Sequence, residues 1–290
     1  MVNMRDDREI PNEFGGHAVR LGADLRLSHM SFQFLSLAPD TNGVALVTIR
    51  RPDKRNALNR QLISELDQAF QVVRDDSSIR ALVLTGEGEQ AFVAGADIGE
   101  IGGLNPLEAE ALSRRGQQVF RLLETMRKPS VAALNGYTLG AGLELAMCAT
   151  VRIASSNAKL GQPEVKLGIV PGYGGTQRLP RLVGRGRALD LLLSGEAIDA
   201  AEAYRIGLVN AVVAQPELLP AAHTWALRVL ANGPLAVGLA MDSVDVGLDG
   251  GLEAGLRFES QAFGLAFASE DRREGTAAFL EKRKPVFAGR

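Results

Sequence analysis

The chain has 290 residues, of which 46% are hydrophobic and 23% are charged, and its formal net charge is −2. These values are typical of a globular protein of one or two domains, and a charge near zero gives no bulk attraction to nucleic acid or to an anionic membrane. The single cysteine, Cys148, excludes a disulfide within the chain. It lies in an apolar segment, which predicts a small buried side chain, and the reducing cytoplasm is the expected compartment.

Residues 1–30 are predicted to form an N-terminal extension, because they show no sustained hydrophobic periodicity. They mix arginine with aspartate and glutamate and lack the apolar stretch of a secretory signal, and their acidic residues argue against a transit peptide. No apolar run anywhere in the chain approaches the roughly 20 residues that span a bilayer. We therefore expect neither export nor contact with a membrane.

Predicted strands and helices alternate in the first part of the chain. Strands are predicted in residues 31–51 (two, around the turn Thr41-Asn42-Gly43), 79–88, 130–136 and 151–161, and helices in residues 59–76 and 107–128. Asn59 is the predicted N-cap of the first helix, and Pro129 stops the second. The strand of residues 130–136 is expected to lead straight into a helix that carries Glu144. This alternation predicts an α/β protein with parallel strand pairing.

From about residue 186 onward the pattern becomes entirely helical. Helices are predicted in residues 186–195, 199–207, 218–233, 234–247, 252–269 and 270–284. Several of these segments carry broad apolar faces that need a partner surface, which indicates an oligomer. The expected organisation is an α/β body followed by a helical C-terminal part.

Two turns rich in small residues follow predicted strands. In AFVAGAD (residues 91–97) the step from Gly95 to Ala96 permits a sharp bend and leaves the Ala96 N–H without an obvious partner in a strand ladder. In NGYTLGAGLE (residues 135–144) the residues around Ala141 expose N–H groups at the start of a helix, where backbone donors lack intrahelical partners. Two such donors that converge on one oxygen would form an oxyanion hole.

Two glutamates lie in apolar surroundings. Glu144 is flanked by leucines in a helix, and Glu164 lies between Pro163 and Val165. If the two carboxyl groups meet, desolvation and mutual repulsion raise at least one pKa, which provides one acid and one base. Taken singly, each has a structural interpretation instead: Glu144 as a buried acid satisfied by an arginine or by backbone donors, and Glu164 as an exposed loop acid.

A dinucleotide-binding fold is a weaker interpretation of the same glycines. Its fingerprint needs three glycines in the pattern G-x-G-x-x-G. Gly140 and Gly142 provide the first two, but Leu145 stands where the third is needed. No acidic residue follows at about 20 residues in the required setting.

Six ordered segments closely resemble the enoyl-CoA hydratase (crotonase) family. They are RPDKRNALN, AFVAGADIGEI, KPSVAALNGYTLGAGLELAM, AKLGQPEVKLGIVPGYGGTQRL, SGEAIDAAEAYRIGLVN and SEDRREGTAAFLEKRKPVF, and the resemblance runs from about residue 31 to the C-terminus. It implies an α/β, crotonase-like (ClpP/crotonase) spiral of ββα units over residues 31–200. Residues 201–290 would form a helical region that builds homotrimers, which pair as homohexamers.

The resemblance also implies roles for the residues already singled out. The backbone N–H groups of Ala96 and Ala141 would hold the thioester carbonyl. The family most often has glycine at the position of Ala141, but a methyl group there leaves the N–H intact. Glu144 would hold and deprotonate the attacking water and Glu164 would protonate the α-carbon, and the reverse or a shared assignment stays open because coupled carboxylates titrate as a pair.

The CoA part of the substrate implies a further set of positions. Lys54 and Arg55 would meet the phosphates, and Lys282 would reach the CoA from a neighbouring subunit. Each of these three is also readable as an ordinary solvated surface charge. Other positions implied in substrate or CoA binding are Ala57, Gly95, Asp97, Ile98, Gly99 and Gly140.

The expected activity is the reversible syn addition of water to a trans-2-enoyl-CoA, which gives a 3-hydroxyacyl-CoA. No cofactor or metal is expected, since His17, His29 and His223 form no ligand-like cluster in the sequence. One alternative is an enoyl-CoA isomerase, which needs a single carboxylate. Another is a branched-chain (methylglutaconyl-type) hydratase. An alternative of a different class is a non-catalytic acyl-CoA-binding or RNA-binding protein, although Lys282-Arg283-Lys284 is too short a basic stretch to favour RNA.

Overall fold

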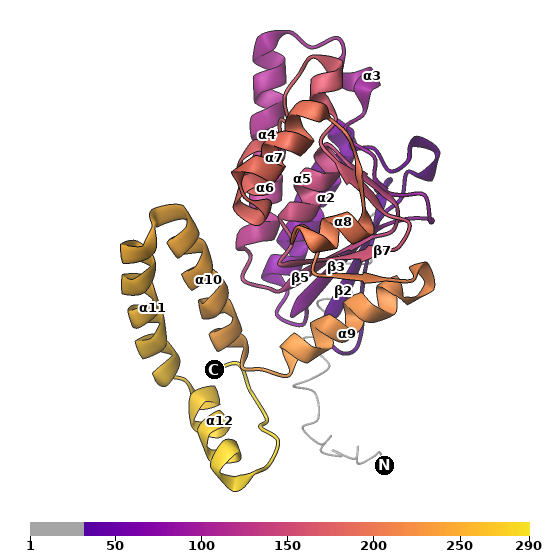
Figure 1. Cartoon of the computed structure of the whole chain (residues 1–290). Coiled ribbons are helices and arrows are strands. Elements are labelled where there is room, and N and C mark those ends of the chain that lie inside the picture. The colour runs from indigo at the N-terminus through magenta and orange to yellow at the C-terminus, as the bar shows by residue number, and fades with distance from the viewer. Residues whose placement is uncertain (1–31) are drawn as a thin grey trace, which may run out of the picture. The chain divides into compact units, whose positions relative to one another are not determined.

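The computed structural model describes residues 32–290, so the extension predicted for residues 1–30 lies outside the described residues. The described residues form two β-sheets with helices packed around them (Figure 1). The larger sheet has the strand order β1 (Leu35–Pro39), β2 (Val44–Ile49), β3 (Ala81–Gly86), β5 (Ser130–Leu134), β7 (Val151–Ser155) and β10 (Ala211–Val213). The pair β1–β2 is antiparallel, as expected for two strands around a tight turn, and all later pairs are parallel.

The core of the larger sheet explains why its strands are continuously apolar. Every residue of β3 and β5 is buried, as is typical of parallel strands covered on both faces. Helix α9 (Leu218–Leu230) crosses one face (Figure 1), where Ala222 and Ala226 pack against Val83 and Val131. Burial of this cluster fixes the register of the strands that lead to the candidate site.

The smaller sheet consists of very short strands, and its first three each follow directly after a strand of the larger sheet. Its order is β4 (Ala91–Val93), β6 (Tyr137–Leu139), β8 (Lys159–Gly161) and β9 (Ile198–Asp199). Thus β3 is followed by β4, β5 by β6 and β7 by β8, and a helix follows each pair. The chain therefore runs as a spiral of ββα units.

Two details of the sequence prediction were wrong here. Residues 130–136 do not lead straight into the helix of Glu144, because β6 intervenes, and residues 151–161 form two strands in different sheets. The chain bends at Gly136, which has φ 150°, and a Cβ there would lie only 2.3 Å from the carbonyl oxygen of Gln90. Three-residue strands are too short to give a periodic signal of their own.

The helices of the α/β part are η1 (Pro52–Lys54), α2 (Arg60–Asp75), α3 (Ile98–Ile101), α4 (Pro106–Thr125), α5 (Ala141–Met147), η2 (Glu164–Leu167), α6 (Gly175–Val183), α7 (Arg185–Ser194), α8 (Ala200–Arg205) and η3 (Gln215–Glu217). The predicted helices are confirmed as α2, α4, α5, α7 and α8, whereas η1, α3, η2, α6 and η3 were not predicted. The predicted N-cap is confirmed, since the Asn59 side chain accepts a hydrogen bond from the Leu62 N–H at 2.9 Å. Cys148 is buried, also as predicted.

The prediction that only helices follow residue 186 was wrong in two places. Strands β9 and β10 lie in this region, and β10 pairs with β7 in the larger sheet. The boundary expected between residues 200 and 201 would place β10 and α9 outside the α/β part. However, β10 is a strand of the larger sheet, and α9 packs against that sheet. The α/β part extends to Leu230, and the purely helical part begins with α10 (Pro234–Gly250).

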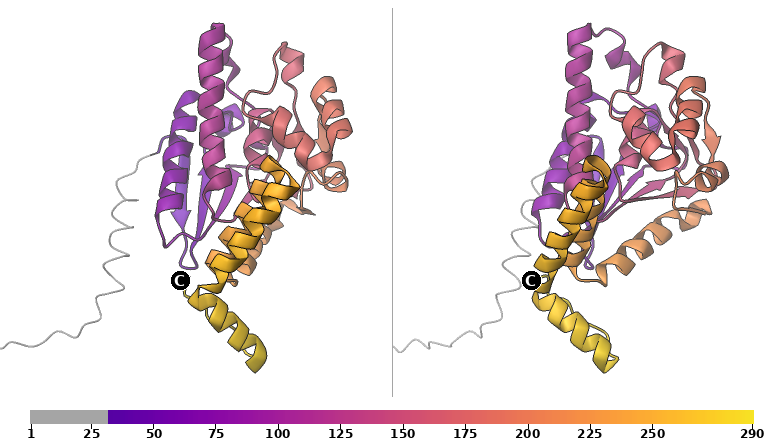
Figure 2. Two further views of the ribbon diagram at one scale, coloured as in Figure 1. Left: turned by 90° about the vertical axis from the view of Figure 1, so that its left-hand side faces the viewer. Right: turned by 60° about the vertical axis from the view of Figure 1, so that its left-hand side comes forward.

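The C-terminal part consists of three helices. Figure 2 shows α10 and α11 (Leu252–Phe267) side by side, with α12 (Glu270–Glu281) after them. Close approach is possible because glycines face each other, and a Cβ on Gly255 would lie 2.7 Å from the Cα of Gly247. Ion pairs Arg127–Asp242 (2.6 Å) and Arg121–Asp249 (3.1 Å) join α10 to α4 and the turn after it.

No single helix within residues 32–290 is long and apolar enough to cross a membrane. One pair of consecutive helical segments, residues 215–230 and 234–250, meets the length and composition criteria when taken together, and it is bent by 105°.

Candidate active site

The turn after β4 leaves one backbone donor free. Gly95 has φ 110°, a conformation that favours glycine, and Leu58 bridges the next residues: its N–H donates to the Gly95 carbonyl (2.9 Å), and its carbonyl accepts from the Asp97 N–H (2.7 Å). Because successive peptide groups of an extended chain point to opposite sides, the Ala96 N–H points away from Leu58. It takes part in none of the backbone hydrogen bonds formed by this turn.

A second free donor lies at the start of α5. Ala141 is the first helical residue, after Gly140 with φ 52°, and no side chain from residues 32–290 caps this helix end. The start of α5 packs directly on β4, since a Cβ on Gly142 would lie 2.0 Å from the Val93 carbonyl oxygen. A Cβ on Gly140 would lie 3.8 Å from the Cα of Gly95, so the two turns are neighbours. The two turns whose N–H groups would form an oxyanion hole therefore lie close together, and the oxyanion hole itself stays a prediction.

Glu144 lies one helical turn further along α5 and is only 1% exposed. Its Oε1 atom accepts two hydrogen bonds of 2.7 Å, from the N–H groups of Tyr173 and Gly175. Burial raises its pKa to about 7 despite these donors, and the charge of Glu164 adds to the effect. The raised pKa that the sequence predicted for this pair of carboxyl groups is confirmed.

Glu164 opens the short helix η2 beside the same turn. Burial raises its pKa to about 7. Its Oε1 atom would lie 2.8 Å from a Cβ on Gly140, so the absence of a side chain there makes room for the carboxylate. The amide nitrogen of the buried Gln162, when it faces Glu164, donates to both carboxylate oxygens at 2.9 Å. Both glutamates therefore lie next to the two free donors.

The residues that contact these carboxylates, and the arginine that contacts the Tyr173 carbonyl beside them, were not predicted from the sequence. Gln162, Tyr173, Gly175 and Arg178 all lie in the segment that carries Glu164, but two of them act through backbone N–H groups, which have no signature in the side-chain pattern. The only available signal was the density of glycines in residues 172–175, which indicates close backbone approach.

The predicted phosphate ligands lie on the loop that precedes α2. Lys54 and Arg55 are both exposed, and Arg55 is in the left-handed region with φ 49°. The Arg55 guanidinium carbon lies 5.7 Å from the ring centroid of Tyr137. The backbone carbonyl of Arg55 accepts a hydrogen bond from the Ala94 N–H at 3.0 Å. The loop is thus fastened beside the turn that carries Ala96, with its cations directed to solvent.

Other predicted binding positions differ in what their side chains do. Asp97 forms an ion pair with Arg51 (3.0 Å) and accepts from the Gly99 N–H (3.2 Å), so its carboxylate holds the start of α3. Ala57 contributes its carbonyl to Arg51 as well. Ile98, by contrast, is 51% exposed next to the Ala96 turn.

Lys282 is exposed at the C-terminal end of α12. Its predicted approach to CoA is from a neighbouring subunit, so this role stays a prediction. Of the three histidines, His17 and His29 lie outside the described residues, and His223 Nε2 lies 2.6 Å from Asp40 Oδ2. Within residues 32–290, no three side chains of His, Cys, Asp or Glu are arranged to hold a metal ion.

Comparison with known proteins agrees with this geometry. A sequence model described as enoyl-CoA hydratase/isomerase matches residues 40–290. A crotonyl-CoA hydratase of Syntrophomonas wolfei is 51% identical over 244 residues, which cover 84% of this chain and 94% of that protein. A short-chain-enoyl-CoA hydratase of Clostridium acetobutylicum is 48% identical over 241 residues, which cover 83% and 92%.

Solved structures give the same result for the fold. The crystal structure of an enoyl-CoA hydratase from Bacillus anthracis superposes with a TM-score of 0.86 at 38% identity and covers 89% of this chain and 100% of that one. A structure from Geobacillus kaustophilus, described as an enoyl-CoA hydratase subunit, gives 0.86 at 41% identity, with 90% and 100% covered. The predicted crotonase-like α/β fold is confirmed, and the chain belongs to the enoyl-CoA hydratase/isomerase family.

Proposed function

We propose that this chain is an enoyl-CoA hydratase, a hydro-lyase that adds water reversibly and syn to a trans-2-enoyl-CoA. The observation that carries the proposal is the pair of glutamates, each with its pKa raised to about 7, beside two free backbone donors. At neutral pH such a pair populates a state with one carboxylate and one carboxylic acid. Hydration needs one group of each kind.

In the proposed reaction, the thioester oxygen accepts hydrogen bonds from the N–H groups of Ala96 and Ala141. The ionised Glu144 takes a proton from water as the water oxygen bonds to C3. The π electrons of C2=C3 move into the enolate, whose negative charge the two donors stabilise, and each donor contributes about 3–4 kcal/mol to lowering the barrier. Protonated Glu164 then gives its proton to C2. The 3-hydroxyacyl-CoA leaves, and proton exchange restores the two glutamates.

The rest of the substrate is proposed to lie along the loops next to this centre. Lys54 and Arg55 would pair with the CoA phosphates from the loop before α2, and Lys282 of a neighbouring subunit would add a third cation. The backbone around Ala57, Gly95, Gly99 and Gly140, with the exposed Ile98 and the fixed turn at Asp97, would border the pantetheine. Proton transfer and electrostatic stabilisation account for every step, so the proposal includes no cofactor. We place the enzyme in the cytoplasm.

The test is the loss of the enone absorbance of crotonyl-CoA on addition of purified protein, with the product identified by mass. We choose crotonyl-CoA because the relatives named above are a crotonyl-CoA and a short-chain-enoyl-CoA hydratase. The expected result is the gain of one water. A shift of the double bond in a 3-enoyl-CoA without water uptake would favour an isomerase. Saturable binding of acyl-CoA without turnover of short, long or branched enoyl-CoAs would favour a binding protein.

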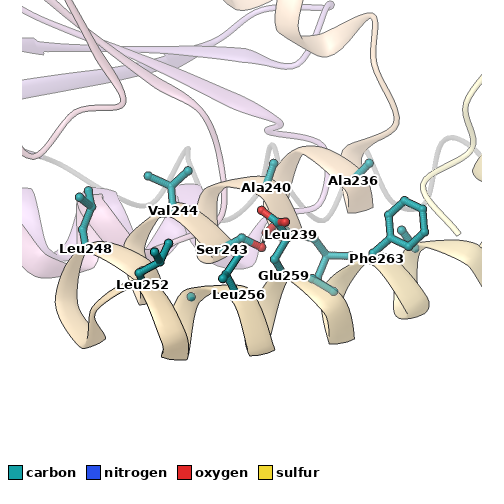
Figure 3. A pocket seen from close by; sticks show the side chains of 14 residues that line it. Ala236, Leu239, Ala240, Ser243, Val244, Leu248, Leu252, Leu256, Glu259 and Phe263 are labelled. Atoms are coloured by element: carbon teal, nitrogen blue, oxygen red, sulfur yellow. Dashed lines mark hydrogen bonds between the residues drawn. The ribbon is translucent and has the colours of Figure 1, made fainter.

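We also propose that the chain forms a homotrimer or a homohexamer through its C-terminal helices. An apolar groove runs between α10 and α11 (Figure 3) and is lined by side chains that include Val244, Leu248, Leu252, Leu256 and Phe263. Each of these five side chains is more than half exposed in the single chain. Exposed apolar patches of this kind usually mark a surface that binds another protein chain.

Light scattering is expected to give three or six times the mass of one chain. The double substitution Leu248→Asp and Leu256→Asp should yield monomers, because two buried charges would oppose association. Leu107→Asp, at another highly exposed leucine on α4, is the matched control and should leave the mass unchanged. A monomeric wild-type protein would contradict the proposed assembly.

A further inference from the structure

We propose that Arg178, held by Glu124 of α4, is a positioning residue that fixes the loop of residues 172–175 and thereby sets which oxygen of Glu144 acts as the base. This inference rests on the proposed function. It concerns a residue that touches neither the substrate nor the carboxylate and that acts through two backbone N–H groups.

The loop of residues 172–175 divides the two oxygens of Glu144 into different environments. Both N–H groups, from Tyr173 and Gly175, donate to Oε1. Oε2 accepts none of the hydrogen bonds formed by the described residues, so its lone pairs are free for a water molecule. The orientation of the base therefore depends on where the loop directs its two N–H groups.

Arg178 determines the path of this loop. Its Nη1 atom donates to the Tyr173 carbonyl at 2.9 Å, and the N–H of the same residue donates to Glu144. The guanidinium lies across Gly174, where φ is 110° and a Cβ would lie 2.1 Å from Nη1. Only a residue without a side chain leaves space for this contact, so the loop and the guanidinium are fitted to each other.

Glu124 fixes the guanidinium in turn. Arg178 Nε and Nη2 donate to the two oxygens of Glu124 at 3.0 Å each, a fork-like geometry that a lysine cannot reproduce. The pair is largely buried, with side-chain exposures of 16% and 20%. The pKa of Glu124 is lowered, since its hydrogen bonds and ion pairs with Arg178 and Arg121 outweigh burial, so the pair stays charged.

Helix α4 holds the loop at further points. Ser113 and Gln117 donate their side-chain hydrogens to the Gly172 carbonyl. The ring of Tyr173 packs edge-on against Phe120, 5.3 Å between centroids, and fills a space that exists because Gly116 has no side chain. A Cβ on Gly116 would lie 2.4 Å from this ring. The loop is thus built on α4, and Arg178 is its charged contact.

The charge of Arg178 also acts on Glu144. The groups that face Glu144 are Glu164 from η2, Cys148 one turn along α5, Tyr173, and Arg178 from α6. Among them Arg178 is the cation, and its charge lowers the pKa of Glu144, as do the two backbone donors, against the larger effect of burial. Loss of Arg178 therefore has a definite sign: it raises the pKa of Glu144.

The chain provides a matched control. Arg121 pairs with the same carboxylate, with Nη1 2.9 Å from Glu124 Oε2, but it is 48% exposed, and its other partner is Asp249 of α10 rather than the loop. A substitution at Arg121 removes an ion pair of Glu124 without releasing Tyr173. Variants of the two arginines therefore distinguish the effect of losing an ion pair with Glu124 from the effect of releasing the loop of residues 172–175.

The experiment measures kcat and KM for crotonyl-CoA against pH in Arg178→Met, Arg178→Lys and Arg121→Met. In Arg178→Met, kcat at pH 7 should fall about 10-fold or more while KM stays within about 3-fold, because orientation and ionisation of the base are lost rather than substrate contacts. Its acid limb should move to higher pH. Arg178→Lys should regain part of kcat, and Arg121→Met should match the wild type within about 2-fold.

A second readout does not depend on turnover. Infrared difference spectra against pH follow the carboxylic-acid band that disappears in Glu144→Gln, and its midpoint should rise in Arg178→Met. An unchanged midpoint, or equal kinetic losses in Arg178→Met and Arg121→Met, would overturn the proposal and leave Arg178 a structural residue.

If Arg178→Met does not fold, Arg178→Gln, which also removes the charge and the fork-like pair with Glu124, replaces it with the same expected shifts. A wild-type protein that does not hydrate crotonyl-CoA would refute the proposed function, while the infrared midpoint would still decide the positioning role.

Discussion

Replacement of either Glu144 or Glu164 by glutamine is expected to lower kcat for crotonyl-CoA hydration about 100-fold to 10,000-fold, the range that a positioned acid or base contributes. Glutamine keeps the shape of the side chain, and in Glu144→Gln its carbonyl can still accept from the Tyr173 and Gly175 N–H groups. It neither accepts a proton from water nor donates one to C2. The KM for crotonyl-CoA should change little, and stopped-flow or steady-state loss of the enone absorbance measures both constants.

The stability of Glu144→Gln is the control for folding, and it has a predicted sign. The pKa of Glu144 is about 7 in the folded protein against 4.5 for the free side chain, so between these values the folded state holds more protons than the unfolded state. Wild-type stability therefore falls as pH rises from about 4.5 to 7, by up to about 3 kcal/mol from this group.

Glutamine does not titrate, so Glu144→Gln should gain stability relative to the wild type over the same interval. Thermal melts at pH 5 and pH 8 test this. A variant that retained near-full hydration activity, or one that melted far below the wild type at pH 8, would contradict the assigned role of Glu144.

The residues alone marked Glu144, Glu164 and the turns around Ala96 and Ala141 as unusual, and the resemblance to the family assigned roles to them. Glu144 was recognisable because a carboxylate among leucines must have a reason to be there, and Glu164 because it stands in a restricted apolar turn. The two turns around Ala96 and Ala141 were recognisable from glycines that follow apolar strands. These signals are local, and a single sequence carries local signals well.

The elements that position these residues were not predictable in the same way. Strands β6 and β10 have three residues each and owe their existence to pairing with β4 and β8 and with β7, contacts that no local pattern encodes. The contact between Glu124 and Arg178 joins residues 54 positions apart. Donors such as the Gly175 N–H belong to the backbone, so their roles appear only when the fold brings a carboxylate to them.

The segment that contains Gln162 and Gly175 contacts both glutamates, so its position affects both carboxyl groups. Gly175 donates its N–H to Glu144, and a Cβ on Gly175 would lie 2.8 Å from the side-chain amide group of Gln162, whose other end faces Glu164. A displacement of this segment therefore moves the partner of each glutamate at once. Matched pKa values near 7 follow from this common burial more than from the mutual repulsion of the pair, since burial is the largest cause for both.

Gly140→Ala is expected to lower kcat at least about 100-fold, an effect comparable to the loss of an oxyanion donor. The new Cβ would lie 2.8 Å from Glu164 Oε1, and φ at this position is 52°, so the methyl group displaces the carboxylate and strains the turn that presents the Ala141 N–H. Both halves of the proposed mechanism are thus disturbed by one methyl group.

Gly168→Ala is the matched control, because Gly168 also has a positive φ, 72°, and ends the helix that Glu164 begins, but its Cβ would meet nothing within 4 Å. Gly168→Ala bears the strain of a left-handed alanine, about 1 kcal/mol in stability. Gly140, with φ 52° and ψ −124°, lies outside that region in a conformation that an alanine tolerates less well, and only Gly140→Ala adds the clash. Gly168→Ala should therefore keep kcat within about 3-fold of the wild type, since loss of stability alone does not change turnover by the folded enzyme. Equal losses of kcat in both variants would mean that backbone strain, and not the space beside Glu164, limits the reaction.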